Sequence, residues 1–85
     1  MFTVMARTDR RNGTSVRETH RFPDSTRVDQ AWFDKEAETI ECLFPDGVRW
    51  VYQEVLPATW QRFVRSGSPG RFIRDILEQH PNGPA

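Results

Sequence analysis

Arginine is the residue type with which this 85-residue chain is best equipped to bind a ligand, because eleven of its twelve basic residues are arginine. The planar guanidinium group binds phosphate or carboxylate through two parallel hydrogen bonds and stacks on flat rings. Arg62 and Arg65 have no acidic residue within one helical turn along the chain, and Arg71 follows the turn formed by residues 66–70. These three arginines predict a surface that binds an anion, such as the phosphates of a nucleic acid.

Two plainer interpretations of the arginines stay open. An excess of arginine over lysine also arises from GC-rich codon usage, and exposed basic residues on a helix are ordinarily just solvated. The formal net charge of zero excludes attraction of the whole molecule to a polyanion. The charge is nevertheless uneven along the chain: residues 1–27 carry six basic and three acidic residues, residues 28–56 two and seven, and residues 57–85 four and two.

Three aromatic residues are candidates for stacking on unpaired bases, namely Trp32, Trp50 and Tyr52. Such stacking contributes about 1–3 kcal/mol per base. Trp50 and Tyr52 share one face of the predicted hairpin with Ile40, Cys42 and Phe44, which favours the face of the sheet that helices cover. Trp32 is more suited to an exposed position, because its neighbour Phe33 points to the opposite face.

Residues for catalysis or metal binding are sparse. Cys42 falls on the predicted core face, and only His20 and His80 could activate it, both near the ends of the chain. One cysteine and two distant histidines do not make a zinc site, and a lone cysteine cannot form an internal disulfide. We therefore expect a non-enzymatic protein without cofactor or metal. No run of residues has the length and apolarity of a membrane span, which predicts a cytoplasmic protein without membrane contact.

The N-terminal residues 1–22 are predicted to lie outside the domain core. Residues 6–21 contain only Ala6 and Val16 as apolar residues. Asn12-Gly13 is well suited to a two-residue hairpin turn, so this segment is either a marginal β-hairpin or a basic arm. The basic residues of the arm that we expect to assist nucleic-acid binding are Arg7, Arg10 and Arg11.

Three strands and two helices are predicted to position these side chains. Residues 28–33 suit a strand, and residues 39–44 and 48–53 flank Pro45-Asp46-Gly47, a sequence typical of a turn. Pairing across this turn sets Cys42 opposite Trp50 and Ile40 opposite Tyr52, which places the larger side chains on one face.

Two short helices should cover that face. Pro57 suits the first turn of a helix in which Trp60, Phe63 and Val64 form an apolar stripe. After Ser66-Gly67, a second helix is expected from Ser68-Pro69 up to Pro81, with its own stripe that contains Phe72, Ile73, Ile76 and Leu77. The predicted fold is therefore α+β: a small three-stranded antiparallel meander, with or without an N-terminal β-ribbon, followed by two helices packed on one face. The domain should span residues 23–80, and residues 81–85 should form a tail.

A series of short motifs occurs in order between residues 25 and 76. They are Ser25-Thr26 with Val28, Phe33-Asp34, Phe44 with Asp46-Gly47, Trp50-Val51-Tyr52, Trp60 with Phe63, and Ser68-Pro69-Gly70-Arg71-Phe72. This array resembles the KTSC domain, a small module found alone in bacterial and phage proteins and at the C-terminus of some lysyl-tRNA synthetases. Trp50 replaces the first tyrosine of the family's Tyr-x-Tyr motif, and Pro69 stands where the family often has lysine.

The resemblance implies RNA binding, a role suggested by the fusion of this module to a tRNA synthetase. Combined with the charge pattern, it predicts a module that binds RNA or single-stranded nucleic acid through Arg62, Arg65 and Arg71. The alternative is an adaptor that docks on another protein, a host factor if the gene is phage-borne, through the acidic sheet edge or a strip formed by Leu43 and Val51. Either a monomer or a homodimer is compatible with both functions.

Overall fold

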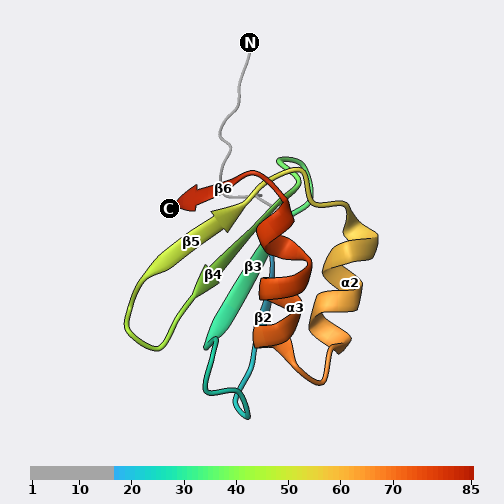
Figure 1. Cartoon of the computed structure of the whole chain (residues 1–85). Coiled ribbons are helices and arrows are strands. Elements are labelled where there is room, and N and C mark those ends of the chain that lie inside the picture. Colours follow the sequence, from blue (N-terminus) through green and yellow to red (C-terminus); the bar gives the residue numbers. More distant parts are fainter. Residues whose placement is uncertain (1–16) are drawn as a thin grey trace.

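The computed structural model describes residues 17–85, and these form one antiparallel sheet with helices on one side (Figure 1). The strands are β2 (Arg17–Arg21), β3 (Gln30–Asp34), β4 (Thr39–Leu43), β5 (Arg49–Tyr52) and β6 (Asn82–Pro84). They lie in the sheet in chain order. The helices are α2 (Pro57–Arg65), α3 (Pro69–Asp75) and a short 3-10 turn, η1 (Leu77–Gln79). The α+β class and the two helices are as predicted.

The sheet has five strands in the described part of the chain, two more than the predicted three-stranded meander, for which an additional N-terminal β-ribbon was left open. Residues 17–21 pair with β3 along their whole length, although we placed them in the arm, and residues 82–84 pair with β5, although we placed them in the tail. Neither added strand has a hydrophobic alternation, and both are held by backbone pairing together with side-chain hydrogen bonds. Trp60 Nε1 donates to Glu18 Oε1 at 3.0 Å, and Trp50 Nε1 donates to Asn82 Oδ1 at 2.8 Å. The predicted turn at residues 12–13 lies outside the described residues.

The central hairpin has the predicted register. Cys42 pairs with Trp50 and Ile40 with Tyr52. The turn closes because Asp46 Oδ1 accepts a hydrogen bond from the backbone N–H of Val48 at 3.1 Å, and because Gly47 adopts a φ of 90°, which only glycine reaches without strain. Local turn chemistry and strand alternation therefore determine this part of the fold.

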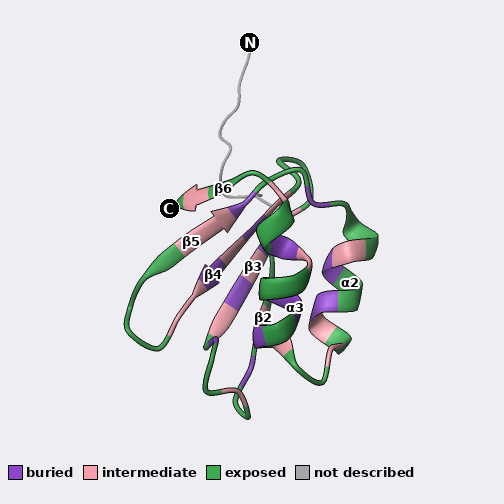
Figure 2. Cartoon of the chain, in the orientation of Figure 1, coloured by how far each residue is buried: buried purple, intermediate pink, exposed green. Residues whose placement is uncertain are grey.

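The core lies between the sheet and the helices, where the buried residues of both layers face each other (Figure 2). Aromatic rings dominate it. Trp60 stacks on Phe33 with ring centroids 5.5 Å apart, and Phe63 packs between Phe22 at 5.1 Å and Phe72 at 5.3 Å. The buried hydrophobic residues are Phe22, Val28, Ala31, Phe33, Ile40, Cys42, Tyr52, Val55, Trp60, Phe63, Phe72, Ile73 and Leu77.

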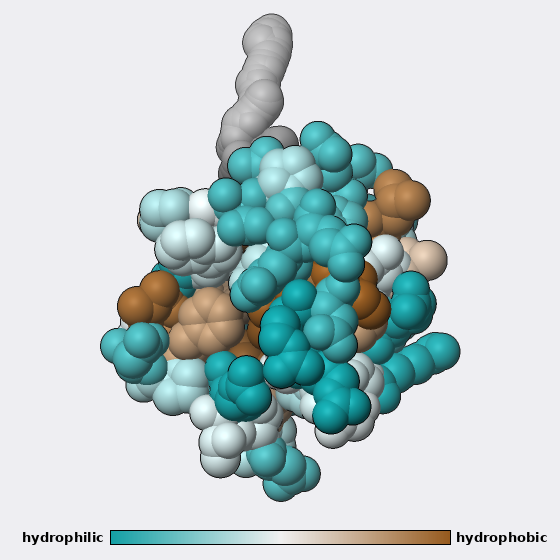
Figure 3. Space-filling model, viewed as in Figure 1, coloured by the Kyte–Doolittle hydropathy of each residue, from teal (hydrophilic) through white to brown (hydrophobic). Residues whose placement is uncertain are grey.

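The second helix is shorter than predicted. It ends at Asp75, and Ile76 leaves the helical conformation with φ −121° and ψ −57° before the chain continues into η1. This break turns Leu77 into the core and brings the chain back to the sheet edge as β6. The outer surface of the helices is mainly hydrophilic (Figure 3).

Candidate functional site

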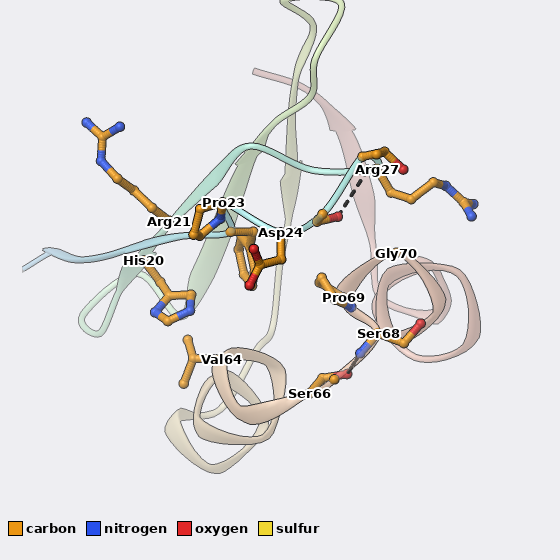
Figure 4. A pocket seen from close by; sticks show the side chains of 14 residues that line it. His20, Arg21, Pro23, Asp24, Arg27, Val64, Ser66, Ser68, Pro69 and Gly70 are labelled. Atoms are coloured by element: carbon orange, nitrogen blue, oxygen red, sulfur yellow. Dashed lines mark hydrogen bonds between the residues drawn. The ribbon is translucent and has the colours of Figure 1, made fainter.

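A hollow opens where the turn between α2 and α3 faces the segment that follows β2. Its volume is about 420 Å³, and its lining comes from residues 20–27 on one side and residues 64 and 66–70 on the other (Figure 4). This volume lies in the range of small-molecule sites, about 300–1,000 Å³. Two segments that carry the resemblance, Ser25-Thr26 and Ser68-Pro69-Gly70, lie on opposite sides of this hollow.

Each side of the hollow is shaped by a serine that closes its own turn. Ser25 Oγ accepts hydrogen bonds from the backbone N–H groups of Arg27 at 3.0 Å and Val28 at 3.3 Å. On the other side, Ser66 Oγ accepts a hydrogen bond from the backbone N–H of Ser68 at 3.0 Å. These bonds fix the loops by short-range contacts and leave the hydroxyl of Ser68, at the start of α3, without a helix-capping bond.

The two sides touch at Gly70. A Cβ atom at this position would lie 2.7 Å from Cβ and 2.8 Å from Cγ of Arg27, closer than the non-bonded contacts that Cβ atoms make in proteins. The buried Gly70 therefore lets α3 begin directly against the loop 22–27, and this contact closes one end of the hollow.

The charges around the hollow are divided between its interior and its rim. Asp24 turns its carboxylate toward the hollow, whereas the guanidinium groups of Arg21 and Arg27 extend away from it (Figure 4). Among residues 17–85, Asp24 takes part in no hydrogen bond or ion pair through its side chain. The hollow is thus lined by the exposed carboxylate of Asp24, which has no partner among residues 17–85, and its rim carries Arg21 and Arg27.

The three arginines predicted to bind an anion lie along the same turn. Arg62 and Arg65 are exposed in the last turn of α2, and Arg71 is exposed near the start of α3. Arg62 carries its Cζ atom over the Phe72 ring, 5.7 Å from the centroid. Arg65 directly precedes Ser66 and Arg71 directly follows Gly70, so both flank residues that line the hollow. The fold places the three arginines at one end of the helical layer.

Ion pairs in the described part of the chain involve other arginines. They join Arg17 and Arg49 to Glu41, at 3.3 and 3.0 Å, and Arg74 to Asp75 at 3.1 Å. Arg71 and Asp75 are four residues apart within α3, but Asp75 pairs with Arg74 instead, and Glu78 lies beyond the end of α3 in η1. Among residues 17–85, no carboxylate forms an ion pair with Arg62, Arg65 or Arg71.

Trp32 lies on the opposite, helix-free face of the sheet, as predicted. Its ring is half-buried, because Arg49 and Arg17 place their Cζ atoms 4.9 and 5.6 Å from its centroid. Glu41, which pairs with Trp32 across the strands, accepts a hydrogen bond from each of these arginines. A base that stacked on Trp32 would compete with these cation–π contacts.

The other two stacking candidates are on the helix side of the sheet. Tyr52 is only 2% exposed, so the prediction that it stacks on bases was wrong. Burial raises the pKa of its phenol, with further increases from Cys42 and Glu78. Trp50 is half-buried against the core, and its Nε1 atom is bonded to Asn82. Tyr52 thus belongs to the core between the sheet and the helices, and the indole of Trp50 joins β5 to β6.

Cys42 is fully buried in the core. Burial, with a smaller contribution from the nearby charge of Glu41, raises the pKa of its thiol from 9.0 to about 12. His20 packs edge-on against Phe22 at 4.7 Å, and Nδ1 of His80 lies 3.1 Å from the carbonyl oxygen of Gln53. In these described contacts, neither histidine is paired with the Cys42 thiol.

We predict that a thiol-specific disulfide reagent at pH 8 modifies Cys42 in the folded protein at least about a hundredfold more slowly than in the urea-unfolded chain. The neutral thiol also links stability to pH: its contribution is fully present below pH 9 and declines as the pH rises from 9 toward 12, because the unfolded chain then releases the proton first. Modification of the native protein at the rate of the unfolded chain would contradict the buried position.

No cluster of three or more His, Cys, Asp or Glu side chains in residues 17–85 is arranged to hold a metal ion. In the same range, no helix combines the length and apolarity needed to cross a membrane. Arg7, Arg10 and Arg11 lie outside the described residues, so their contribution stays a prediction.

Sequence reasoning missed the wall of the hollow formed by residues 20–24. We assigned residues up to 22 to an arm because the segment is almost entirely polar, and polar strands give no hydrophobic alternation to detect. The one available signal was Phe22-Pro23-Asp24-Ser25, an apolar residue followed by three turn formers. It marks the point where the strand ends and the loop over α3 begins.

Comparison with known proteins places this geometry in a family. Residues 24–80 match the model of the KTSC domain. Among solved structures, the crystal structure of a KTSC domain protein from Yersinia pestis aligns with a TM-score of 0.74 and 18% sequence identity, and the alignment covers 82% of this chain and 99% of that one. No curated protein matches the chain.

Proposed function

The chain belongs to the KTSC domain family, and from this premise we propose that it is a non-enzymatic module that binds RNA or another single-stranded nucleic acid at the α2–α3 turn. The observation that carries the proposal is the exposure of Arg62, Arg65 and Arg71 along one turn, with no carboxylate of residues 17–85 paired to any of them. The arginines of the described chain that do form ion pairs are others: Arg17 and Arg49, on the open sheet face, and Arg74 in α3.

The chemistry of these groups supports contacts to the phosphate backbone. An exposed guanidinium keeps its five donors available, and two of them match the oxygens of one phosphate. Contacts of this kind position a strand without reading its sequence. The net charge of zero limits long-range attraction, so binding should depend on these local contacts.

A steep dependence on salt is the expected signature. With three phosphate contacts to a single strand, the logarithm of the association constant should fall with a slope of about −2 against the logarithm of the salt concentration. Raising the salt from 50 to 200 mM should therefore weaken binding of a fluorescently labelled uridine heptanucleotide about twentyfold, measured by fluorescence anisotropy. An affinity that does not change with salt, or no binding at 50 mM, would contradict the proposal.

A protein-binding adaptor is the second candidate, and the open sheet face favours it. Leu43 and Val51 project from neighbouring strands on the side without helices, and both are only half-buried. Exposed apolar residues beside charged ones are typical of protein contacts. Pull-down from a lysate treated with nuclease separates the candidates: a partner protein that survives the treatment and is lost in Leu43→Ser, Val51→Ser supports the adaptor, whereas loss of every partner with nuclease supports nucleic-acid binding.

A further inference from the structure

The hollow beside the α2–α3 turn combines features that a phosphate site does not need. Phe22, Pro23, Val64 and Pro69 give it an apolar part beside polar lining from the serines of both loops, and the exposed Asp24 directs a carboxylate toward it (Figure 4). A carboxylate repels phosphate, so the backbone of a bound strand should remain at the rim. This lining suits a group that is flat or small, has apolar faces, and donates hydrogen bonds at one edge.

A nucleobase has these properties, and the bases differ in the donors that they offer. Guanine carries two adjacent donors, N1–H and the N2 amino group, which match the two oxygens of one carboxylate. Adenine and cytosine place an acceptor beside their amino group, and uracil has a single N–H between two carbonyl oxygens. A single carboxylate therefore favours guanine, because the other bases bring an oxygen or a lone pair toward a negative charge.

We infer that the hollow holds one unstacked guanine base of the bound strand, with Asp24 accepting hydrogen bonds from its N1–H and N2 amino groups. The inference rests on the proposed function, because the arginines of the turn must hold the strand. Arg65 and Arg71 flank lining residues along the chain, and Arg21 and Arg27 extend outward from the same hollow. The flanking phosphates are thus held outside while the base points in.

The side chains around the hollow are compatible with this arrangement. Asp24 is free of partners among residues 17–85, so binding breaks no described hydrogen bond of its carboxylate. Pro23 and Pro69 offer rigid apolar surfaces to a base at little cost in conformational entropy. The serine hydroxyl oxygens of residues 25 and 66 already accept backbone hydrogen bonds, which keeps both walls in place when the hollow is empty.

The test compares three labelled heptanucleotides that differ only in the central base: uridine, guanosine or inosine in a run of uridines. Inosine is guanosine without the N2 amino group. We expect the full-length protein to bind the guanosine oligonucleotide about tenfold more tightly than the uridine one, with inosine between them. Asp24→Asn should abolish this preference and leave the affinity for the uridine oligonucleotide within a few-fold. Glu36→Gln removes the same charge from the exposed turn between β3 and β4, which does not line the hollow, and should retain the preference.

The outcomes separate this inference from the proposed function. Equal affinities for the three oligonucleotides, all weakened by salt, would overturn the guanine site and leave phosphate binding by the arginines intact. A guanosine preference that persists in Asp24→Asn would also overturn it. If none of the three oligonucleotides binds at 50 mM salt, the proposed function fails and the guanine site fails with it.

Discussion

Replacing Trp60 with alanine should lower the free energy of unfolding by about 3–5 kcal/mol, measured by urea denaturation followed by circular dichroism. Trp60 is 2% exposed, stacks on Phe33 and contacts Phe63, so its removal leaves a cavity where the helix and sheet layers meet. A domain of this size is stabilised by about 4–13 kcal/mol in total. The loss is therefore a large fraction of the total, and at the lower end of this range it is enough to unfold the domain.

Two further tryptophan variants separate packing from hydrogen bonding. Trp60→Phe keeps an aromatic ring and loses the bond from Nε1 to Glu18, so it should cost about 1 kcal/mol and loosen β2 specifically. Trp32→Ala, on the open sheet face, should cost less than Trp60→Ala because its ring is only half-buried. Equal losses for Trp60→Ala and Trp32→Ala would show that the helices do not cover the face that we describe.

The double substitution Arg62→Glu, Arg65→Glu should weaken binding of the uridine heptanucleotide at least about sixtyfold at 50 mM salt. Loss of two phosphate contacts to a single strand accounts for that factor at this salt concentration, and the two added carboxylates repel the strand further. Both residues are exposed, so the fold should be retained, and an unchanged far-ultraviolet circular dichroism spectrum checks this. The remaining slope of affinity against salt should be about −0.7 or smaller in magnitude.

The matched control reverses two arginines on the opposite face, Arg17→Glu and Arg49→Glu. It changes the net charge by the same amount, so any effect of overall charge appears equally in both proteins. Because these arginines bind Glu41 and cover Trp32, the control should reduce stability slightly and leave most of the binding. Equal weakening by the two double variants would show that the α2–α3 turn is not the binding surface.

Local sequence signals predicted the centre of the fold. The β4–β5 hairpin follows from a proline, an aspartate and a glycine between two alternating segments, and the helices follow from Pro57 and Pro69 with apolar stripes behind them. Each of these signals acts within a few residues of the chain. The register that sets Ile40 opposite Tyr52 could therefore be predicted without knowledge of distant contacts.

The two outer strands could not be predicted from such signals. β2 is polar at every position, and it is held by pairing with β3 and by the bond between Glu18 and Trp60, residues 42 positions apart in the sequence. β6 consists of Asn82, Gly83 and Pro84, which resemble a loop in composition, and it is fixed by the bond of Asn82 to the Trp50 indole. In both cases a tertiary contact outweighs weak strand propensity.

The candidate site likewise contains one part that could be predicted from the sequence and one part that could not. Arg62 and Arg65 could be chosen from spacing alone, because the absence of acidic residues near them is visible in the sequence, and Arg71 could be chosen from its place directly after the turn at residues 66–70. The hollow could not, because its second wall comes from the loop after β2, which reaches α3 only when β2 joins the sheet. Asp24 therefore gains its significance from the fold and not from any motif.

The most direct test of the central claim is an amide chemical-shift map of the isotope-labelled protein titrated with the uridine heptanucleotide at 50 mM salt. Binding through the arginines of the helical layer predicts that the largest shifts fall in residues 62–71, with smaller ones in residues 20–27. Shifts concentrated on β3, β4 and β5 around Trp32, or no shifts at a saturating concentration, would contradict it.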